Sequence, residues 1–204
     1  MARPKKSDRT SDTQIRDRIQ KEAERLFAKK GFTSTTTREI AKAARVNNAL
    51  IHYYFKGKAE LYKAIITQNV DQVFKAILSG LEHDLSIESA IDVIVESYYS
   101  LFDQKSTILP PMLARELADG ASFIKSIVAE KYDTIIPIYE RAIRTSNVQT
   151  EQLLSLMFII GIILFSILSR PIQIALREKL GLPTPDPDDV KRYIKLFVKQ
   201  GIIL

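Results

Sequence analysis

Apolar residues recur three and four positions apart along most of the chain, and this spacing predicts helices rather than strands. The pattern predicts an all-α protein with helices over about 12–30, 37–44, 47–55, 58–81, 86–102, 112–119, 122–143, 153–180 and 187–203. Pro137 and Pro171 fall inside two of these segments, where proline removes a backbone donor and is expected to bend the helix.

Two short helices lie near the N-terminus. Thr36 stands three residues before Glu39, which is the spacing of a capping box at the start of a helix. Arg45 and Val46 follow this helix, and Asn47 can cap a second one that runs to Phe55. Two short helices joined by a turn of three or four residues predict a helix-turn-helix.

The second short helix presents polar side chains to the outside. Leu50 or Ile51, together with Phe55, can anchor it inward. This leaves an outer face made of Asn47, Asn48, Ala49, His52, Tyr53 and part of Tyr54. Amide, imidazole and phenol groups suit contacts with base edges and phosphates.

The same stretch resembles the DNA-binding signature of tetracycline-repressor (TetR) type transcriptional regulators. The matching residues are Ile40, Ala41, Ala44, Val46, Ile51, Tyr54, Phe55, Lys56, Lys58, Glu60 and Leu61. The resemblance covers about the first third of the chain, and beyond it only length, helicity and order of parts agree. It implies a three-helix DNA-binding domain over residues 1–58 and a larger helical domain for effector binding and dimerisation over residues 59–204.

The resemblance also implies roles for individual residues. The residues expected to contact DNA are Thr37, Asn47, Asn48, Ala49, Leu50, His52, Tyr53, Tyr54 and Lys58. Among them, Thr37 and Lys58 are expected to contact phosphates of the DNA backbone. Arg45 stands where the family often has glycine, and a left-handed backbone there would cost a non-glycine residue about 1 kcal/mol. The implied partner is a double-stranded, pseudo-palindromic operator.

Charge is distributed unevenly along the chain. Residues 1–58 hold 15 Lys or Arg against 6 Asp or Glu, whereas the whole chain carries only +6. This asymmetry favours a polyanion partner for the N-terminal part, although a solvated charge run is the alternative. Residues 1–11 are basic, and we expect them to form a mobile arm. They lack the apolar core of a secretory signal. With no cysteine in the chain, we expect a cytoplasmic protein.

The segment from Leu153 to Leu168 is almost continuously apolar. Its sixteen residues fall short of the roughly 20 that cross a bilayer. A helix that is apolar all round is otherwise buried in a core or a subunit interface. We therefore predict a homodimer through the helices near 150–180 and 187–203, arranged as a four-helix bundle and not associated with a membrane.

Aromatic and soft side chains gather in the middle helices, where the family resemblance implies a small-molecule effector, whose identity the sequence leaves open. The candidate ligand-binding residues are Tyr98, Phe102, Met112, Arg115, Phe123, Tyr132 and Tyr139. Packing in the helical core is the alternative explanation for each apolar residue among them.

No pattern for catalysis is visible in the sequence. Nucleophile elbows, phosphate loops, dinucleotide fingerprints and metalloprotease patterns are missing, so we expect no enzyme, no cofactor and no metal. The acidic cluster Asp186, Asp188 and Asp189 is explained by the start of the last helix. The sequence thus predicts a ligand-responsive transcriptional regulator, most simply a repressor. The alternative from another class is a helical lipid carrier or membrane-surface protein.

Overall fold

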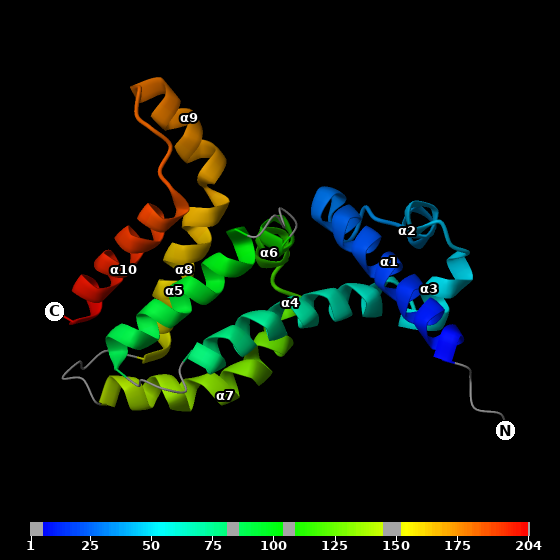
Figure 1. Cartoon of the computed structure of the whole chain (residues 1–204), viewed down its shortest axis with the longest axis horizontal. Helices are drawn as coiled ribbons and strands as arrows, with labels where there is room; N and C mark the ends of the chain where they lie inside the picture. Colours follow the sequence, from blue (N-terminus) through cyan, green and yellow to red (C-terminus); the bar gives the residue numbers. More distant parts are fainter. Residues whose placement is uncertain (1–5, 81–85, 104–108, 145–151, 204) are drawn as a thin grey trace. The chain divides into compact units, whose positions relative to one another are not determined.

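The computed structural model describes residues 6–80, 86–103, 109–144 and 152–203, and every regular element within these ranges is a helix (Figure 1). The all-α prediction is therefore confirmed. The helices are α1 (Lys6–Lys30), α2 (Thr37–Ala44), α3 (Asn48–Phe55), α4 (Lys58–Gly80), α5 (Ile87–Asp103), α6 (Leu109–Ala118), α7 (Ile124–Arg144), α8 (Gln152–Leu168), α9 (Arg170–Leu180) and α10 (Pro187–Ile203).

The first helix begins earlier than the sequence pattern suggested. The expected mobile arm over residues 1–11 is wrong for residues 6–11, which form the first turns of α1; residues 1–5 lie outside the described residues. Pro4 is the last residue before α1 that disfavours a helix. The residues after it can join α1, because extending an existing helix costs far less free energy than nucleating a new one.

Helix α6 also begins earlier than expected, at Leu109 instead of Met112. The predicted start at residue 112 placed Pro110 and Pro111 before this helix, but both lie in its first turn. The first backbone N–H groups of a helix have no partner within it, so proline loses no hydrogen bond there. The two prolines therefore begin α6 instead of preceding it.

The chain forms two compact units, and the first combines residues 1–69 with residues 111–124. Its core contains the fully buried side chains of Ile19, Phe27, Ile40, Ile51 and Leu61. Helix α1 packs on the short helix α2, which in turn packs on the short helix α3. Because this unit includes a distant segment, it does not coincide with a cut after residue 58, and the division into domains 1–58 and 59–204 stays a prediction.

The second compact unit combines residues 70–110 with residues 125–204. Helices α5, α8 and α10 lie side by side in it (Figure 1). Their contact is made by buried aliphatic side chains, which are Ile91, Ile94, Val95, Ile159, Ile163, Ile194 and Val198.

A ladder of ion pairs joins α10 to α5 at the edge of this core. Lys191 and Lys195 place their Nζ atoms 2.9 and 2.7 Å from the Glu96 carboxylate, and Lys199 Nζ lies 2.8 Å from Asp92. Partial burial raises the pKa of Glu96, but the hydrogen bonds from Lys195 and Lys191 outweigh it and leave the pKa below its ordinary value. Lys191 and Lys195 therefore favour the ionised form of the Glu96 carboxylate.

The apolar segment is divided into two helices. Leu156–Leu168 and Arg170–Leu180 meet at a bend of 60°, with Pro171 just after the junction, as predicted. Among the described residues, no single helix is long and apolar enough to cross a bilayer, and only this bent pair reaches the required length and composition. Pro137 lies inside α7, which continues past it.

Replacing Glu96 with Gln tests the ladder. A carboxylate with a lowered pKa in the folded state stabilises it fully above the unfolded-state pKa of about 4.3, and this stabilisation is lost as the pH falls through the folded-state pKa. We expect Glu96→Gln to lower the denaturation midpoint at pH 6–7 and the difference from the wild type to shrink toward pH 3. Urea unfolding followed by circular dichroism measures it, with the exposed Glu88→Gln as control. A difference that does not change with pH would contradict the role of Glu96.

Candidate nucleic-acid interface

Helix α2 begins with the capping box that the sequence predicted. The Thr36 hydroxyl accepts from the Glu39 backbone N–H at 3.2 Å, and the Glu39 carboxylate accepts from the Thr36 N–H at 3.0 Å. A hydrogen bond from Lys30, followed by those from the Thr36 backbone and hydroxyl, lowers the pKa of Glu39 to about 2. Ionised Glu39 thus holds the start of α2 over the physiological pH range.

The turn between α2 and α3 contains a strained residue. Arg45 adopts φ 53° and ψ 49°, the left-handed conformation in which a side chain is unfavourable. Its backbone N–H donates to the carbonyl of Lys42, while the N–H of Val46 donates to that of Ala41. This confirms the expectation that Arg45 stands at a position where glycine would be relaxed.

Helix α3 has a buried and an exposed side. Asn47 caps it by accepting from the Ala49 N–H at 2.9 Å, as predicted. Ile51 is 0% and Phe55 5% exposed, so they anchor the helix inward. Asn47, Ala49, His52 and Tyr53 are exposed, Tyr53 to 73%, while Asn48, Leu50 and Tyr54 are half-buried.

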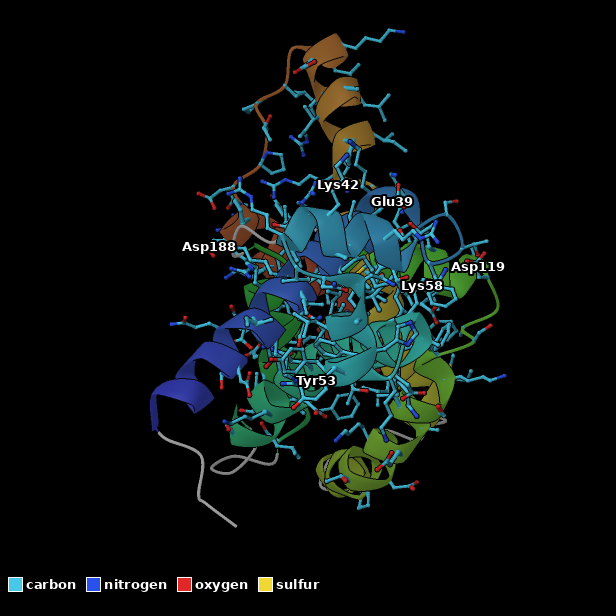
Figure 2. The ribbon with its side chains drawn as sticks, turned by 90° about the vertical axis from the view of Figure 1, so that its right-hand side faces the viewer. Glu39, Lys42, Tyr53, Lys58, Asp119 and Asp188 are labelled. Atoms are coloured by element: carbon cyan, nitrogen blue, oxygen red, sulfur yellow. The ribbon has the colours of Figure 1, made fainter. Side chains whose placement is uncertain are left out.

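Figure 2 shows Tyr53 on α3 and Glu39 and Lys42 on α2. The rings of Tyr53 and Tyr54 meet edge to face with centroids 4.9 Å apart. An exposed pair of phenol rings beside amide and imidazole groups can contact phosphates and base edges. The buried anchors Ile51 and Phe55 hold this face outward without help from a ligand.

Contacts from α1 fix α3, and sequence reasoning missed them. The Tyr54 hydroxyl donates to Asp12 Oδ1 at 2.8 Å, and the Arg16 guanidinium lies over the Phe55 ring, 5.2 Å from its centroid. The hydrogen bond to Asp12 raises the pKa of Tyr54 and keeps the phenol protonated. Neither pairing follows from local sequence, because the partners are about 40 residues apart.

Lys58 has a structural role that the sequence did not reveal. Its Nζ donates to the carbonyl oxygens of Phe32 and Thr35, both at 2.9 Å, and lies 4.3 Å from the centroid of the Phe32 ring. The ammonium therefore fastens the α1–α2 loop to the first turn of α4. Thr37 is half-buried in the first turn of α2. Contact of either residue with phosphate stays a prediction.

The predicted effector-binding residues are divided between the two compact units. Met112, Arg115 and Phe123 belong to the first unit and Tyr98 to the second. Met112 is buried, and Arg115 donates to backbone carbonyls at the end of α1. The side chains of Phe102, Tyr132 and Tyr139 lie outside the described part of the structure. Their grouping around a ligand stays a prediction.

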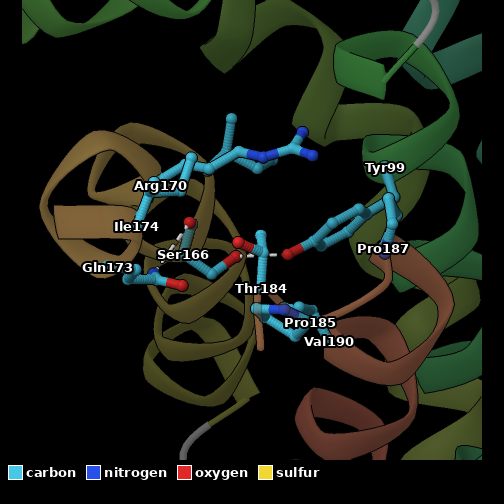
Figure 3. A pocket seen from close by; sticks show the side chains of 10 residues that line it. Tyr99, Ser166, Arg170, Gln173, Ile174, Thr184, Pro185, Pro187 and Val190 are labelled. Carbon is cyan, nitrogen blue, oxygen red and sulfur yellow. Dashed lines mark hydrogen bonds between the residues drawn. The ribbon is translucent and has the colours of Figure 1, made fainter. Parts of the chain in front are cut away.

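A small pocket lies in the second unit, between α5, α8, α9 and the segment before α10 (Figure 3). The Tyr99 hydroxyl and Ser166 Oγ lie 2.6 Å apart in it, and Gln173 Nε2 donates to the Ser166 carbonyl at 3.1 Å. Its volume of about 40 Å³ has room for about three waters, since one water needs about 10–15 Å³. Ser166 is a polar residue within the apolar helix α8, and this is the sequence signal that could have pointed to the pocket.

The geometry of the first unit defines a class of protein. A short recognition helix is anchored by two buried side chains, crossed by α1 and exposed along a polar face, which is the arrangement of a helix-turn-helix DNA-binding protein.

Comparisons with known proteins point to one family. Residues 19–65 match the family model described as bacterial regulatory proteins, tetR family. The chain is 29% identical over 145 residues to the probable HTH-type transcriptional regulator YttP of Bacillus subtilis, covering 68% of this chain and 67% of that protein. It is 25% identical to the HTH-type transcriptional repressor NicS of Pseudomonas putida, covering 68% and 65%. The chain thus spans about two thirds of the length of these relatives.

A solved structure agrees over nearly the whole chain. The transcriptional regulator FadR of Bacillus subtilis, in complex with stearoyl-CoA, matches with a TM-score of 0.73 at 17% identity, covering 91% of this chain and 98% of that one. At this identity the likeness shows the fold. Together these findings support a TetR-family transcriptional regulator, as the sequence resemblance implied, and the proteins of that family are transcriptional regulators rather than enzymes.

Replacing Arg45 with Gly tests the strain in the turn. Relief of about 1–2 kcal/mol of left-handed strain exceeds the roughly 0.5–1 kcal/mol that glycine loses through its greater freedom when unfolded. We expect the free energy of unfolding to rise by about 0.5–1 kcal/mol, measured by urea denaturation. Ala43→Gly in the helical part of α2 is the control and should lower it by about 1 kcal/mol. A loss of stability in Arg45→Gly would contradict the strain.

Proposed function

We propose that the protein is a ligand-responsive repressor that binds a pseudo-palindromic operator as a homodimer. The observation that carries the proposal is the exposed polar face of α3, with Ile51 and Phe55 buried behind it. In the proposed complex, α3 of each protomer enters the major groove, at half-sites roughly 34–36 Å apart. Asn47, Asn48, Ala49, Leu50, His52 and Tyr53 reach toward base edges and phosphates.

The charge distribution supports a nucleic-acid partner. The first 58 residues hold 15 basic against 6 acidic side chains, so the excess of positive charge lies with the helix-turn-helix. A basic surface attracts the phosphate backbone and releases condensed counterions when it binds. Thr37 and Lys58 are proposed as phosphate contacts beside α3.

The exposed apolar faces of α8 and α10 support a homodimer. Leu154, Met157, Phe158 and Phe165 recur on one side of α8 and are 44–72% exposed. Tyr193, Leu196 and Phe197 form a similar stripe on α10 with exposures of 50–68%. Large exposed apolar patches are unusual on monomers and mark interaction sites. Gly161 lies within the α8 face, where added atoms would meet nothing, so a second helix can approach closely there.

A small-molecule effector is proposed for the second unit. NicS is named as a repressor and FadR was solved in complex with stearoyl-CoA, which supports ligand-controlled repression in this chain. The effector would release DNA only to the extent that it binds the DNA-free conformation more tightly than the DNA-bound one. The 40 Å³ pocket is too small for such a molecule, so this pocket would have to open to bind it.

The phosphate contact of Lys58 can be separated from its structural role. A lost phosphate contact reduces the slope of log affinity against log salt concentration by about 0.9. We expect Lys58→Ala to weaken binding to all duplexes and to reduce this slope by that amount, measured by fluorescence anisotropy with DNA selected from a randomised pool. Lys63→Ala, an exposed lysine on the same helix, is the control.

A weaker affinity with an unchanged slope would leave Lys58 only its hydrogen bonds to Phe32 and Thr35. If the wild-type protein selects no duplex and associates with liposomes instead, the proposed function itself is overturned in favour of a membrane-surface protein.

The dimer interface is tested by placing a charge on it. Burying a phenylalanine stabilises an interface by about 1.5–3 kcal/mol, and a carboxylate in its place also loses solvation. We expect Phe165→Glu to raise the dimer dissociation constant at least tenfold in sedimentation velocity experiments. Leu117→Glu, an exposed leucine on α6, is the matched control. An unchanged dimer in Phe165→Glu would remove α8 from the interface.

A further inference from the structure

The C-terminal end of α1 is capped by a side chain from far along the chain. Arg115 Nη1 donates to the carbonyl oxygens of Phe27 and Ala28, at 3.0 and 2.6 Å, and Nη2 donates to that of Lys29 at 3.1 Å. The last carbonyls of a helix have no partner within it, and the negative end of the helix dipole favours a cation. Arg115 meets both requirements with one planar group.

The next residue makes the corresponding contact with another helix. Glu116 is 4% exposed, and its Oε2 accepts from the backbone N–H groups of Phe123 and Ile124, at 3.1 and 3.2 Å, where α7 begins. It also hydrogen-bonds to Tyr62 of α4; burial first, and then this carboxylate, raise the pKa of the phenol. Arg115 and Glu116, which are consecutive residues of α6, thus bind the end of α1, the start of α7 and Tyr62 of α4.

Aromatic packing joins the same segments. The centroid of the Phe123 ring lies 5.0 Å from the centroids of both the Phe32 and the Tyr62 rings. The Tyr62 and Phe27 rings meet edge to face, with their centroids 4.8 Å apart. Gly31 passes close to Arg115, since a Cβ at Gly31 would lie 3.5 Å from Arg115 Cδ. Residues 111–124 are therefore an integral part of the first compact unit.

The position of α1 determines the position of the recognition helix. Ile19 and Phe27 are fully buried in the core of the first unit, where α1 packs on α2 and α2 packs on α3. The Tyr54 hydroxyl bonds to Asp12, and Arg16 covers Phe55. A shift of α1 therefore shifts the groups that hold α3.

From these contacts we infer that Arg115 is a positioning residue for DNA binding, acting through α1 on the recognition helix. This inference rests on the proposed binding of operator DNA. Arg115 touches no base or phosphate in this role. Its loss frees the last turn of α1, broadens the orientations of α3 and weakens operator binding, while the number of phosphates neutralised stays the same.

The experiment combines three variants of the whole 204-residue chain. Arg115→Met keeps the unbranched stem but removes the guanidinium, and Arg115→Lys restores the charge without the planar fork. Arg177→Met is the matched control, because Arg177 Nη1 also donates to a backbone carbonyl, that of Pro183 at 2.8 Å, but in the second unit. The probe is the duplex that the wild-type protein selects from randomised DNA, measured by fluorescence anisotropy at several salt concentrations.

We expect Arg115→Met to weaken operator binding about tenfold with an unchanged salt slope, and Arg115→Lys to lie between it and the wild type. Arg177→Met should bind as the wild type does. Wild-type affinity in Arg115→Met would overturn the inference. A salt slope reduced by about 0.9 would also overturn it, because Arg115 would then contact phosphate directly.

Hydrogen exchange without DNA provides a second measurement. The Gly31 N–H donates to the Phe27 carbonyl at 2.8 Å, beside the Arg115 guanidinium. Faster exchange of the Gly31 amide in Arg115→Met than in Arg177→Met supports the capping of α1, and unchanged exchange contradicts it. If the wild-type protein selects no DNA, the proposed function fails while this measurement still decides whether Arg115 holds α1.

Discussion

Burial of the apolar face of α1 is the interaction on which the rest of the DNA-binding unit depends. Helices α2 and α3 have eight residues each, too few to be stable alone in water. They persist because Ile40, Ala44 and Ile51 lose all contact with water in the core that α1 supplies. Because the buried residues anchor α3, most of its exposed side can remain polar.

The second constraint is the pairing of backbone groups where α1 ends. The turn after α1 bends back through Gly31, and two cations from other parts of the chain bind the carbonyls there. Lys58 takes the carbonyls of the loop and Arg115 those of the last helical turn. Buried or half-buried carbonyls without partners would be costly, so these contacts fix the loop as well as satisfy it.

Local sequence was sufficient for much of this architecture. The capping box at Thr36 and the cap at Asn47 follow from neighbours a few residues apart, whereas the left-handed Arg45 was expected from the resemblance to a family that often has glycine there. The exposed face of α3 followed from helical spacing in the same way. Contacts across long separations, such as Tyr54 with Asp12 and Arg115 with α1, could not be predicted, because no local pattern specifies which distant carbonyl or carboxylate a side chain meets. The two carbonyls that Lys58 binds could not be predicted either, because they lie 26 and 23 residues before it in the chain.

The order of Arg115 and Glu116 along α6 has a further consequence. The cation points at the carbonyl end of α1, and the anion points at the N–H end of α7. Each charge therefore meets the helix end of opposite partial charge. Exchanging the two residues would leave composition and net charge unaltered, yet both contacts would become repulsive. The order of the two charges along α6 is therefore what matters. It matches the negative end of the α1 dipole and the positive end of the α7 dipole.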